Sequence, residues 1–221
     1  MADEIEKLTI ARFTEKDKNR IEELVARERP LTIMLNNREL VTLLCWPAEQ
    51  RFLAAGFLYS EGLINSKDEI KKITVDENRG VVRVETEEDN ESAGELVFKR
   101  FITSGCGRGA SFYSSADAGA MAKVESQIRL LVEDVFALMK AFHRGSKVYR
   151  MTGGVHSAAL CETKDILLFA EDIGRHNAID KIFGQCLLED LPTDERVIVT
   201  SGRISSEILL KVARRNIPVV I

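Results

Sequence analysis

One cysteine stands in a setting that favours thiol chemistry. Cys106 lies in the glycine-rich segment Ser104-Gly105-Cys106-Gly107-Arg108-Gly109, which places a cationic side chain two residues after the sulfur. A flexible and electropositive setting favours the thiolate, which is the nucleophilic form of cysteine. The segment therefore predicts a reactive thiol at Cys106, and the alternative is a loop cysteine without chemistry.

The other three cysteines lie in apolar surroundings. Cys45, Cys161 and Cys186 each follow or interrupt a run of hydrophobic residues, which predicts buried thiols that act as small hydrophobic side chains. No two cysteines have C-x-x-C spacing, so a zinc ribbon is not expected. Nothing in the sequence indicates an oxidising compartment, so disulfides are not expected either.

Three polar motifs occur at strand ends in the second half of the sequence. They are Met151-Thr152-Gly153-Gly154-Val155-His156, the segment from Glu171 to Lys181, and the segment from Thr200 to Glu207. In parallel α/β sheets, ligands bind at the carboxyl ends of strands, where helix N-termini favour anions. Arg175 and Arg203 each occupy a strand-to-helix turn. Each motif alone could simply cap a helix, but together they predict a pocket for a phosphate-bearing ligand.

The elements that position these groups fall into two parts. The first part contains a helix or irregular segment over 19–28, a hairpin over 30–46, a helix from 47 to about 62, and short strands over 73–75, 81–84 and 95–102. The second contains a long helix with one apolar face from Val124 to Phe142, strands over 157–161, 166–170, 197–200 and 218–221, and helices over 173–188 and 205–215.

This order of elements predicts an α/β fold. Alternation of strand and helix in the second part favours parallel strand pairing. We expect an N-terminal β-rich part with one helix over residues 1–105, and an α/β domain over residues 106–221. The change from short strands to long helical periods places the boundary near residues 100–115.

Composition excludes several classes of protein. The chain has 221 residues, with 31 basic and 35 acidic side chains and 45% hydrophobic residues, which is not the composition of a disordered protein. Neither half carries the basic excess of a nucleic-acid surface. No stretch approaches the roughly 18 apolar residues of a membrane span. The acidic N-terminus lacks the apolar core of a signal peptide, so we expect a cytoplasmic protein.

The motifs also limit the possible chemistry. A zinc nucleobase deaminase would need H-x-E and P-C-x-x-C motifs, and neither occurs. No P-loop is present, and no metal site is expected. A hydrolase that pairs Cys106 with His156 or His176 is conceivable, because sequence distance does not exclude it. A reactive thiol near an anion-binding pocket better suits a carrier that receives a group on sulfur and passes it to a phosphorylated molecule.

Five motifs, in order, resemble those of the FdhD type of formate dehydrogenase accessory sulfurtransferase, over about Pro30 to Ile221. These motifs are Pro30-Leu31-Thr32-Ile33, the segment from Gly56 to Ile64, Thr152-Gly153-Gly154-Val155-His156, the segment from Glu171 to Lys181, and Ser201-Gly202-Arg203-Ile204-Ser205. The resemblance implies a cytidine-deaminase-like α/β layer with a smaller β-containing part. It implies a carrier that takes persulfide sulfur from a cysteine desulfurase. The acceptor would be the molybdenum or tungsten bis(pterin guanine dinucleotide) cofactor that formate dehydrogenase needs.

The resemblance also assigns residues and partners. Cys106 becomes the persulfide carrier. The residues implied for cofactor binding are Thr152, Gly153, Gly154, His156, Asp172, Gly174, Arg175, His176, Asn177, Ser201, Gly202 and Arg203. The implied partners are a cysteine desulfurase and formate dehydrogenase, with no nucleic acid or membrane, and the α/β layer could form a homodimer.

Two features depart from the family pattern. Many members carry C-x-x-C in the loop, whereas Gly109 occupies the second position here. The sequence also stops at Ile221, where the family continues for some tens of residues, so the C-terminal end is expected to be missing. The single loop cysteine leaves open a second hypothesis, a chaperone that delivers the cofactor without sulfur transfer.

Overall fold

The secondary structure follows most of the predicted pattern. The structure is a computed structural model that describes residues 4–87, 102–103 and 123–221. Its strands are β1 (Ile5–Phe13), β2 (Lys18–Ala26), β3 (Arg29–Leu35), β4 (Arg38–Cys45), β5 (Ile70–Asp76), β6 (Val81–Thr86), β7 (Ile102–Thr103), β8 (His156–Cys161), β9 (Ile166–Asp172), β10 (Val197–Thr200) and β11 (Val219–Val220). Its helices are α1 (Gln50–Ser60), the 3-10 turn Lys67–Glu69, α4 (Val132–Gly145), α5 (Lys147–Thr152), α6 (Arg175–Leu188) and α7 (Ser206–Arg214).

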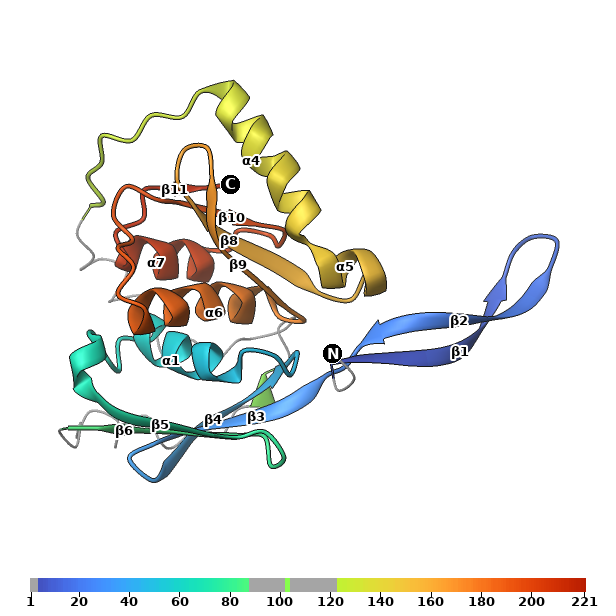
Figure 1. Cartoon of the computed structure of the whole chain (residues 1–221), viewed down its shortest axis with the longest axis horizontal. Helices are drawn as coiled ribbons and strands as arrows, with labels where there is room; N and C mark the ends of the chain where they lie inside the picture. Colours follow the sequence, from blue (N-terminus) through green and yellow to red (C-terminus); the bar gives the residue numbers. More distant parts are fainter. Residues whose placement is uncertain (1–3, 88–101, 104–122) are drawn as a thin grey trace.

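The elements form layers, with helices between two sheets (Figure 1). A five-stranded sheet of order β5-β6-β3-β4-β7 is covered by α1, and a four-stranded sheet of order β11-β10-β8-β9 is covered by α6 and α7. Helix α4 packs on the opposite face of the four-stranded sheet through Leu138 and Phe142. Mixed sheets with helices confirm the α/β class. The predicted boundary at 105/106 lies outside the described residues.

The predicted hairpin over 30–46 is confirmed as β3 and β4. Asn36 and Asn37 form its turn with φ of 47° and 64°, a left-handed conformation that asparagine tolerates and that two-residue hairpin turns require. Alternate residues of β3, such as Leu31 and Ile33, are fully buried against α1. The hairpin therefore supplies the floor of the first hydrophobic core.

Helices α1 and α6 join the two halves of the molecule. A buried ion network sits at one end of this contact, where Lys211 of α7 donates to both carboxylate oxygens of Asp180, at 3.0 and 2.9 Å. Asp180 also accepts from Ser60 at 2.6 Å, and Lys211 lies 3.2 Å from Glu61. Buried charges are tolerated when they are paired in this way. The network connects α1, α6 and α7.

The strands of the four-stranded sheet were predicted to pair in parallel, and this prediction is wrong for two of the three strand pairs. Strand β8 pairs antiparallel with both β9 and β10, and only β10 and β11 run parallel. The connection between β8 and β9 is a tight turn in which the Glu162 amide donates to the Asp165 carbonyl at 2.9 Å. A turn this short cannot provide the crossover that parallel strands need.

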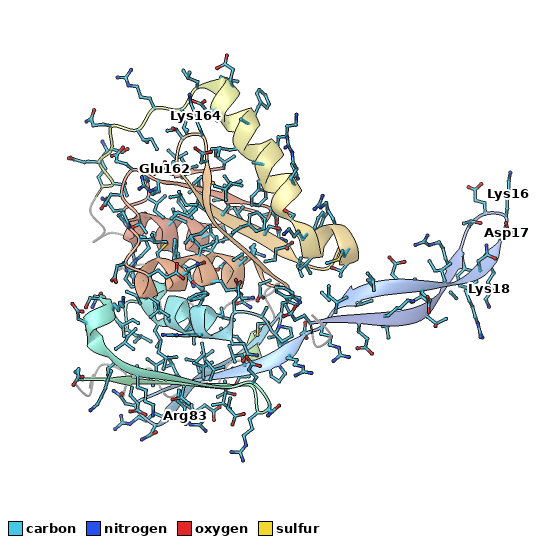
Figure 2. All side chains as sticks on the ribbon, in the orientation of Figure 1. Lys16, Asp17, Lys18, Arg83, Glu162 and Lys164 are labelled. Atoms are coloured by element: carbon cyan, nitrogen blue, oxygen red, sulfur yellow. The ribbon has the colours of Figure 1, made fainter. Side chains whose placement is uncertain are left out.

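Residues 19–28 were expected to be helical or irregular, and this expectation is wrong. Strands β1 and β2 form an antiparallel two-stranded hairpin, here called the arm, that projects from the layered body in Figure 1. Figure 2 shows Lys16, Asp17 and Lys18 at its far tip. Charged side chains pair across its strands, as Arg12 does with Glu23 at 3.0 Å. Most residues of both arm strands are exposed. The arm therefore has no buried face whose pattern the sequence could show.

Helix α4 begins later than predicted. Its first residue is Val132 rather than Val124. The preceding segment is fixed outside a helix, because the Ser126 hydroxyl and the Gln127 amide both donate to the carboxylate of Glu195. Among the described residues, no helix is long and apolar enough to cross a membrane.

Candidate functional site

A cavity of about 630 Å³ lies at one end of the four-stranded sheet. Its lining comes from α4, α5, the turn before β8, and the segments that follow β9 and β10. The lining residues are Met139, Phe142, His143, Ser146, Tyr149, Gly153, Gly154, Val155, His156, Ser157, Ile173, Thr200 and Ser201. Four of the residues predicted for cofactor binding are among them, and the volume suits a small-molecule ligand.

Antiparallel pairing explains why the three motifs converge. The first motif precedes β8, whereas the second and third follow β9 and β10. Because β8 runs opposite to both neighbours, its start lies at the same edge as their ends. His156 is therefore the register partner of Asp172, and the Ser201 amide donates to the Ser157 carbonyl at 3.0 Å. The three motifs lie close together, as predicted, but antiparallel rather than parallel pairing brings them there.

The Thr152-Gly153-Gly154 turn forms one wall of the cavity. Gly153 ends α5 in the left-handed region with φ of 64°, which glycine adopts at no steric cost. Thr152 stabilises the turn, because its hydroxyl donates to the Val148 carbonyl at 2.9 Å and accepts from the Gly154 amide at 3.2 Å. Thr152 thus positions the wall, while the two glycines expose backbone to the cavity.

His156 and Ser201 form a polar pair in the lining of the cavity. The Nδ1 of His156 lies 3.4 Å from the Ser201 hydroxyl, which also accepts from the Ser157 amide at 2.9 Å. Burial lowers the pKa of His156, and the neighbouring Arg175 lowers it further. A neutral imidazole beside a hydroxyl can donate or accept hydrogen bonds at neutral pH.

Arg175 and Gly202 are in direct contact, as members of two different motifs. A Cβ atom added to Gly202 would lie 2.7 Å from the Cβ of Arg175, so only glycine lets the arginine side chain cross the backbone here. Arg203 follows and is exposed. The structure therefore brings the two predicted arginines to the same sheet edge as the cavity, though neither lines it.

His176 lies behind this edge and is mostly buried. Burial lowers its pKa to about 4, and the cations of Lys211 and Arg175 add to the effect. Its Nε2 lies 3.3 Å from a carboxylate oxygen of Glu207, but this contact lacks hydrogen-bond geometry. A neutral His176 brings no positive charge to a phosphate, so charge must come from the arginines.

Asp172 and Asn177 do not line the cavity. They belong to a buried hydrogen-bond network behind it. Asp172 is fully buried and accepts from the Gly174 amide at 3.0 Å, Asn177 at 2.9 Å and the Trp46 amide at 3.2 Å. Its charge is balanced by the ammonium of Lys181 at 2.8 Å. These bonds tie the end of β9 and the start of α6 to the β4 end.

The sequence analysis did not predict the roles of two buried residues, Lys181 and Glu171. Lys181, 1% exposed, also donates to the Glu171 carbonyl at 2.9 Å. The Glu171 carboxylate accepts from the Val148 and Tyr149 amides at 2.9 Å each, which fixes the first turn of α5. The feature of the sequence that could have indicated these roles is a charged residue inside a largely apolar helix or strand. Such a residue is buried only when its charge is paired.

The three cysteines that the structure describes are buried, as predicted. Cys45, Cys161 and Cys186 are free thiols buried in the three main hydrophobic clusters. Burial raises the pKa of each to about 12, so none supplies a thiolate at neutral pH. The predicted carrier Cys106 lies outside the described residues. Within the described ranges, no group of three or more His, Cys, Asp or Glu side chains is placed to hold a metal.

Known proteins provide an independent comparison. The sulfur carrier protein FdhD of Bacillus subtilis is 43% identical over 210 residues, covering 95% of this chain and 80% of that protein. That of Listeria innocua is 40% identical, covering 96% and 82%. A crystal structure from Desulfotalea psychrophila, described as a formate dehydrogenase accessory protein, matches with a TM-score of 0.78. It is 24% identical and covers 98% of this chain and 82% of that one, which shows a shared fold.

The family comparison covers the motifs discussed above. The model of the FdhD/NarQ family matches residues 26–221, which contain the glycine-rich cysteine segment and all three polar motifs. The match begins at the last residue of β2, so it includes the layered body and leaves out nearly all of the arm. The chain therefore belongs to the FdhD/NarQ family.

Proposed function

We propose that this chain is a sulfur carrier in formate dehydrogenase maturation. It accepts sulfur from a cysteine desulfurase on Cys106 and passes it to its substrate, the molybdenum or tungsten bis(pterin guanine dinucleotide) cofactor. Family membership and the names of the relatives support the sulfur-carrier role. The observation that carries the cofactor assignment is the convergence of three motifs on one cavity.

The chemistry proposed for Cys106 is thiol exchange. The Cys106 thiolate attacks the outer sulfur of the desulfurase persulfide, a new S–S bond forms, and the desulfurase cysteine leaves as thiolate. The positive charge of Arg108 favours the Cys106 thiolate. Loss of the outer sulfur to the acceptor regenerates that thiolate. One cysteine suffices for this cycle, so Gly109 in place of a second cysteine does not prevent it.

The cavity suits the ring of a nucleotide better than its phosphates. Its described lining contains no Asp, Glu, Lys or Arg, and Phe142, Tyr149 and Ile173 supply apolar surface. A planar heteroaromatic ring can pack on such walls, and His156, Ser201 and exposed backbone can hydrogen-bond its edge. The phosphates would then lie outside, toward Arg175 and Arg203, whose guanidinium groups match phosphate oxygens.

Three finer expectations accompany this function. The α/β part, with helices on both faces of its four-stranded sheet, would have a cytidine-deaminase-like arrangement. The protein would work in the cytoplasm, where the desulfurase and its dehydrogenase client would meet it. Two copies could associate through the α/β layer.

The test is intact mass after incubation with a cysteine desulfurase and cysteine. We expect a reducible gain of one sulfur atom in the wild type and none in Cys106→Ala. The three buried thiols, with pKa values raised to about 12, provide an internal control, because they should not accept sulfur. If the wild type gains nothing while the desulfurase loads another acceptor, sulfur transfer through this chain is wrong.

The alternative is a chaperone that delivers the cofactor without carrying sulfur, and the absence of a second loop cysteine at Gly109 favours it. A chaperone would keep supporting formate dehydrogenase maturation as Cys106→Ala and support it less well as Arg203→Met. A sulfur carrier would lose maturation as Cys106→Ala and also support it less well as Arg203→Met. Maturation assays on these two variants therefore separate the two functions.

A further inference from the structure

A second cavity, of about 540 Å³, lies at the root of the arm. It shares no lining residue with the first cavity. The short helix α5 separates the two, with Tyr149 on the first cavity and Val148 and Met151 on the second. Nothing in the proposed sulfur-carrier function uses this space.

The walls of the second cavity are apolar, aromatic and held in place. Trp46, Phe169 and Ile166 line it. Trp46 is 8% exposed, and its indole N–H donates to the Glu4 carbonyl at 2.9 Å. Phe169 packs on Phe142 with ring centroids 5.3 Å apart. Such rigid aromatic walls suit the apolar part of a small ligand.

The charge at this cavity is predominantly negative. Glu4, Glu49 and Glu171 line it, against the single cation Lys147. The Glu171 carboxylate is already bound by the two amides at the start of α5. Glu49 is different, because this residue is exposed to solvent and the described residues give its carboxylate no hydrogen-bond or ion-pair partner.

Glu49 also has an unusual backbone. It precedes α1 at the N-cap position with φ of 57°, and its side chain makes no capping bond. Non-glycine residues adopt this left-handed conformation uncommonly. Burial raises the pKa of Glu49, the ammonium of Lys181 lowers it, and the carboxylates of Asp172, Glu4 and Glu171 raise it. A cation bound beside Glu49 would add to the stabilisation that Lys181 provides and offset the repulsion from the three carboxylates.

We propose that the cavity at the root of the arm binds a small organic cation with an apolar tail. The ammonium group pairs with the Glu49 carboxylate, and the tail packs against Trp46 and Phe169. The Trp46 ring already has the ammonium of Lys181 over it, at 5.2 Å from its centroid, so the carboxylate attracts the ammonium group of the ligand while the aromatic walls bury its tail. Anions of the same size are disfavoured, because three glutamates and one lysine line the cavity.

The chain provides its own probe for this proposal, because Trp46 is its only tryptophan. Hexylammonium should shift Trp46 emission saturably, whereas hexanoate and 1-hexanol at equal concentration should bind at least tenfold more weakly. Glu49→Gln should weaken hexylammonium binding about tenfold, the loss expected for one charge-assisted hydrogen bond. Glu39→Gln, which removes an exposed carboxylate from β4, is the matched control and should bind as the wild type does.

A blocking variant completes the experiment. Ala48 lines the cavity, and Ala48→Phe should abolish the emission change while the urea midpoint shows that the protein is folded. Equal binding of hexanoate and hexylammonium would overturn the proposed charge selectivity. Unchanged binding by Glu49→Gln, or no saturable response to any of the three probes, would overturn the site itself. None of these outcomes affects the Cys106 test.

Discussion

Gly56 of α1 and Gly184 of α6 lie in backbone contact, and each occupies space that a side chain on the other helix would need. A Cβ on Gly56 would lie 1.7 Å from the Asp180 carbonyl oxygen and 2.7 Å from the Gly184 nitrogen. A Cβ on Gly184 would lie 1.9 Å from the Phe52 carbonyl oxygen. The two halves of the molecule are therefore joined where two helices touch without side chains between them.

Replacing Gly184 by alanine should strongly destabilise the protein. The added methyl group meets backbone atoms that cannot rotate away, so the helices must separate, and overpacking of this kind costs about 1–3 kcal/mol or more. Urea unfolding followed by circular dichroism would measure the loss. Gly154→Ala is the control, because its Cβ would meet nothing closer than 3.7 Å. Equal midpoints for the two variants would contradict the proposed close packing.

Lys181→Met should also be destabilising, by about 3–5 kcal/mol, because it leaves the buried carboxylate of Asp172 without its counter-charge. Lys164→Met, at an exposed lysine, should change the free energy of unfolding by less than about 0.5 kcal/mol. Adding Asp172→Asn to Lys181→Met should recover part of the loss. A double variant no more stable than Lys181→Met would show that the pair is not coupled in this way.

His176 should make stability depend on pH. Its pKa is about 4 in the folded state and 6.5 in the unfolded chain, so the unfolded state binds more protons between these values. Stability from a neutral His176 is complete above about pH 6.5 and is lost as the pH falls toward 4, by up to about 3 kcal/mol. Asp180, with its pKa raised to about 6 by burial, acts in the opposite direction.

The comparison that isolates His176 is wild type against His176→Gln from pH 4 to 7. Asp180 is present in both proteins, so its contribution largely cancels. The stability of wild type relative to the variant should decrease as the solution becomes more acidic. A constant difference over this range would mean that His176 titrates normally in the folded protein.

Arg203 should distinguish a nucleotide from its nucleoside. If the phosphates lie toward Arg203, Arg203→Met should weaken guanosine diphosphate binding about fivefold, close to 1 kcal/mol, and leave guanosine binding unchanged. Calorimetric titration would measure both affinities. Arg51→Met, at an exposed arginine of α1, is the control for nonspecific charge effects. Parallel losses for guanosine and its diphosphate would assign Arg203 a structural role instead.

Local patterns in the sequence were enough to predict the elements with buried faces. The hairpin around Asn36 and Asn37 was predicted because turn residues separate two apolar runs. Helices α6 and α7 were predicted because their apolar residues recur with helical spacing. The clustering of His156, Arg175 and Ser201 was also predicted, since each follows or precedes a strand end.

Long-range relationships could not be read in the same way. Pairing direction in the second sheet depends on the tight turn at Glu162. The prediction of parallel pairing overlooked this turn, although the segment between the predicted strands over 157–161 and 166–170 is too short for the crossover that parallel strands need. The supporting roles of Asp172 and Asn177 depend on Lys181 and on the distant backbone of β4. The arm was missed because the apolar residues of its strands do not alternate strictly with polar ones: in β2, Ile21, Leu24 and Val25 have a spacing that also suits a helix.

The arm also affects how the whole molecule moves in solution. A compact chain of this length has a radius of gyration of about 17 Å, and each nine-residue strand of the arm spans roughly 30 Å. The extension makes rotational diffusion anisotropic and raises the frictional coefficient above that of a sphere of equal mass. In small-angle scattering, the pair-distance distribution should therefore show an extended tail that the layered body alone would not produce.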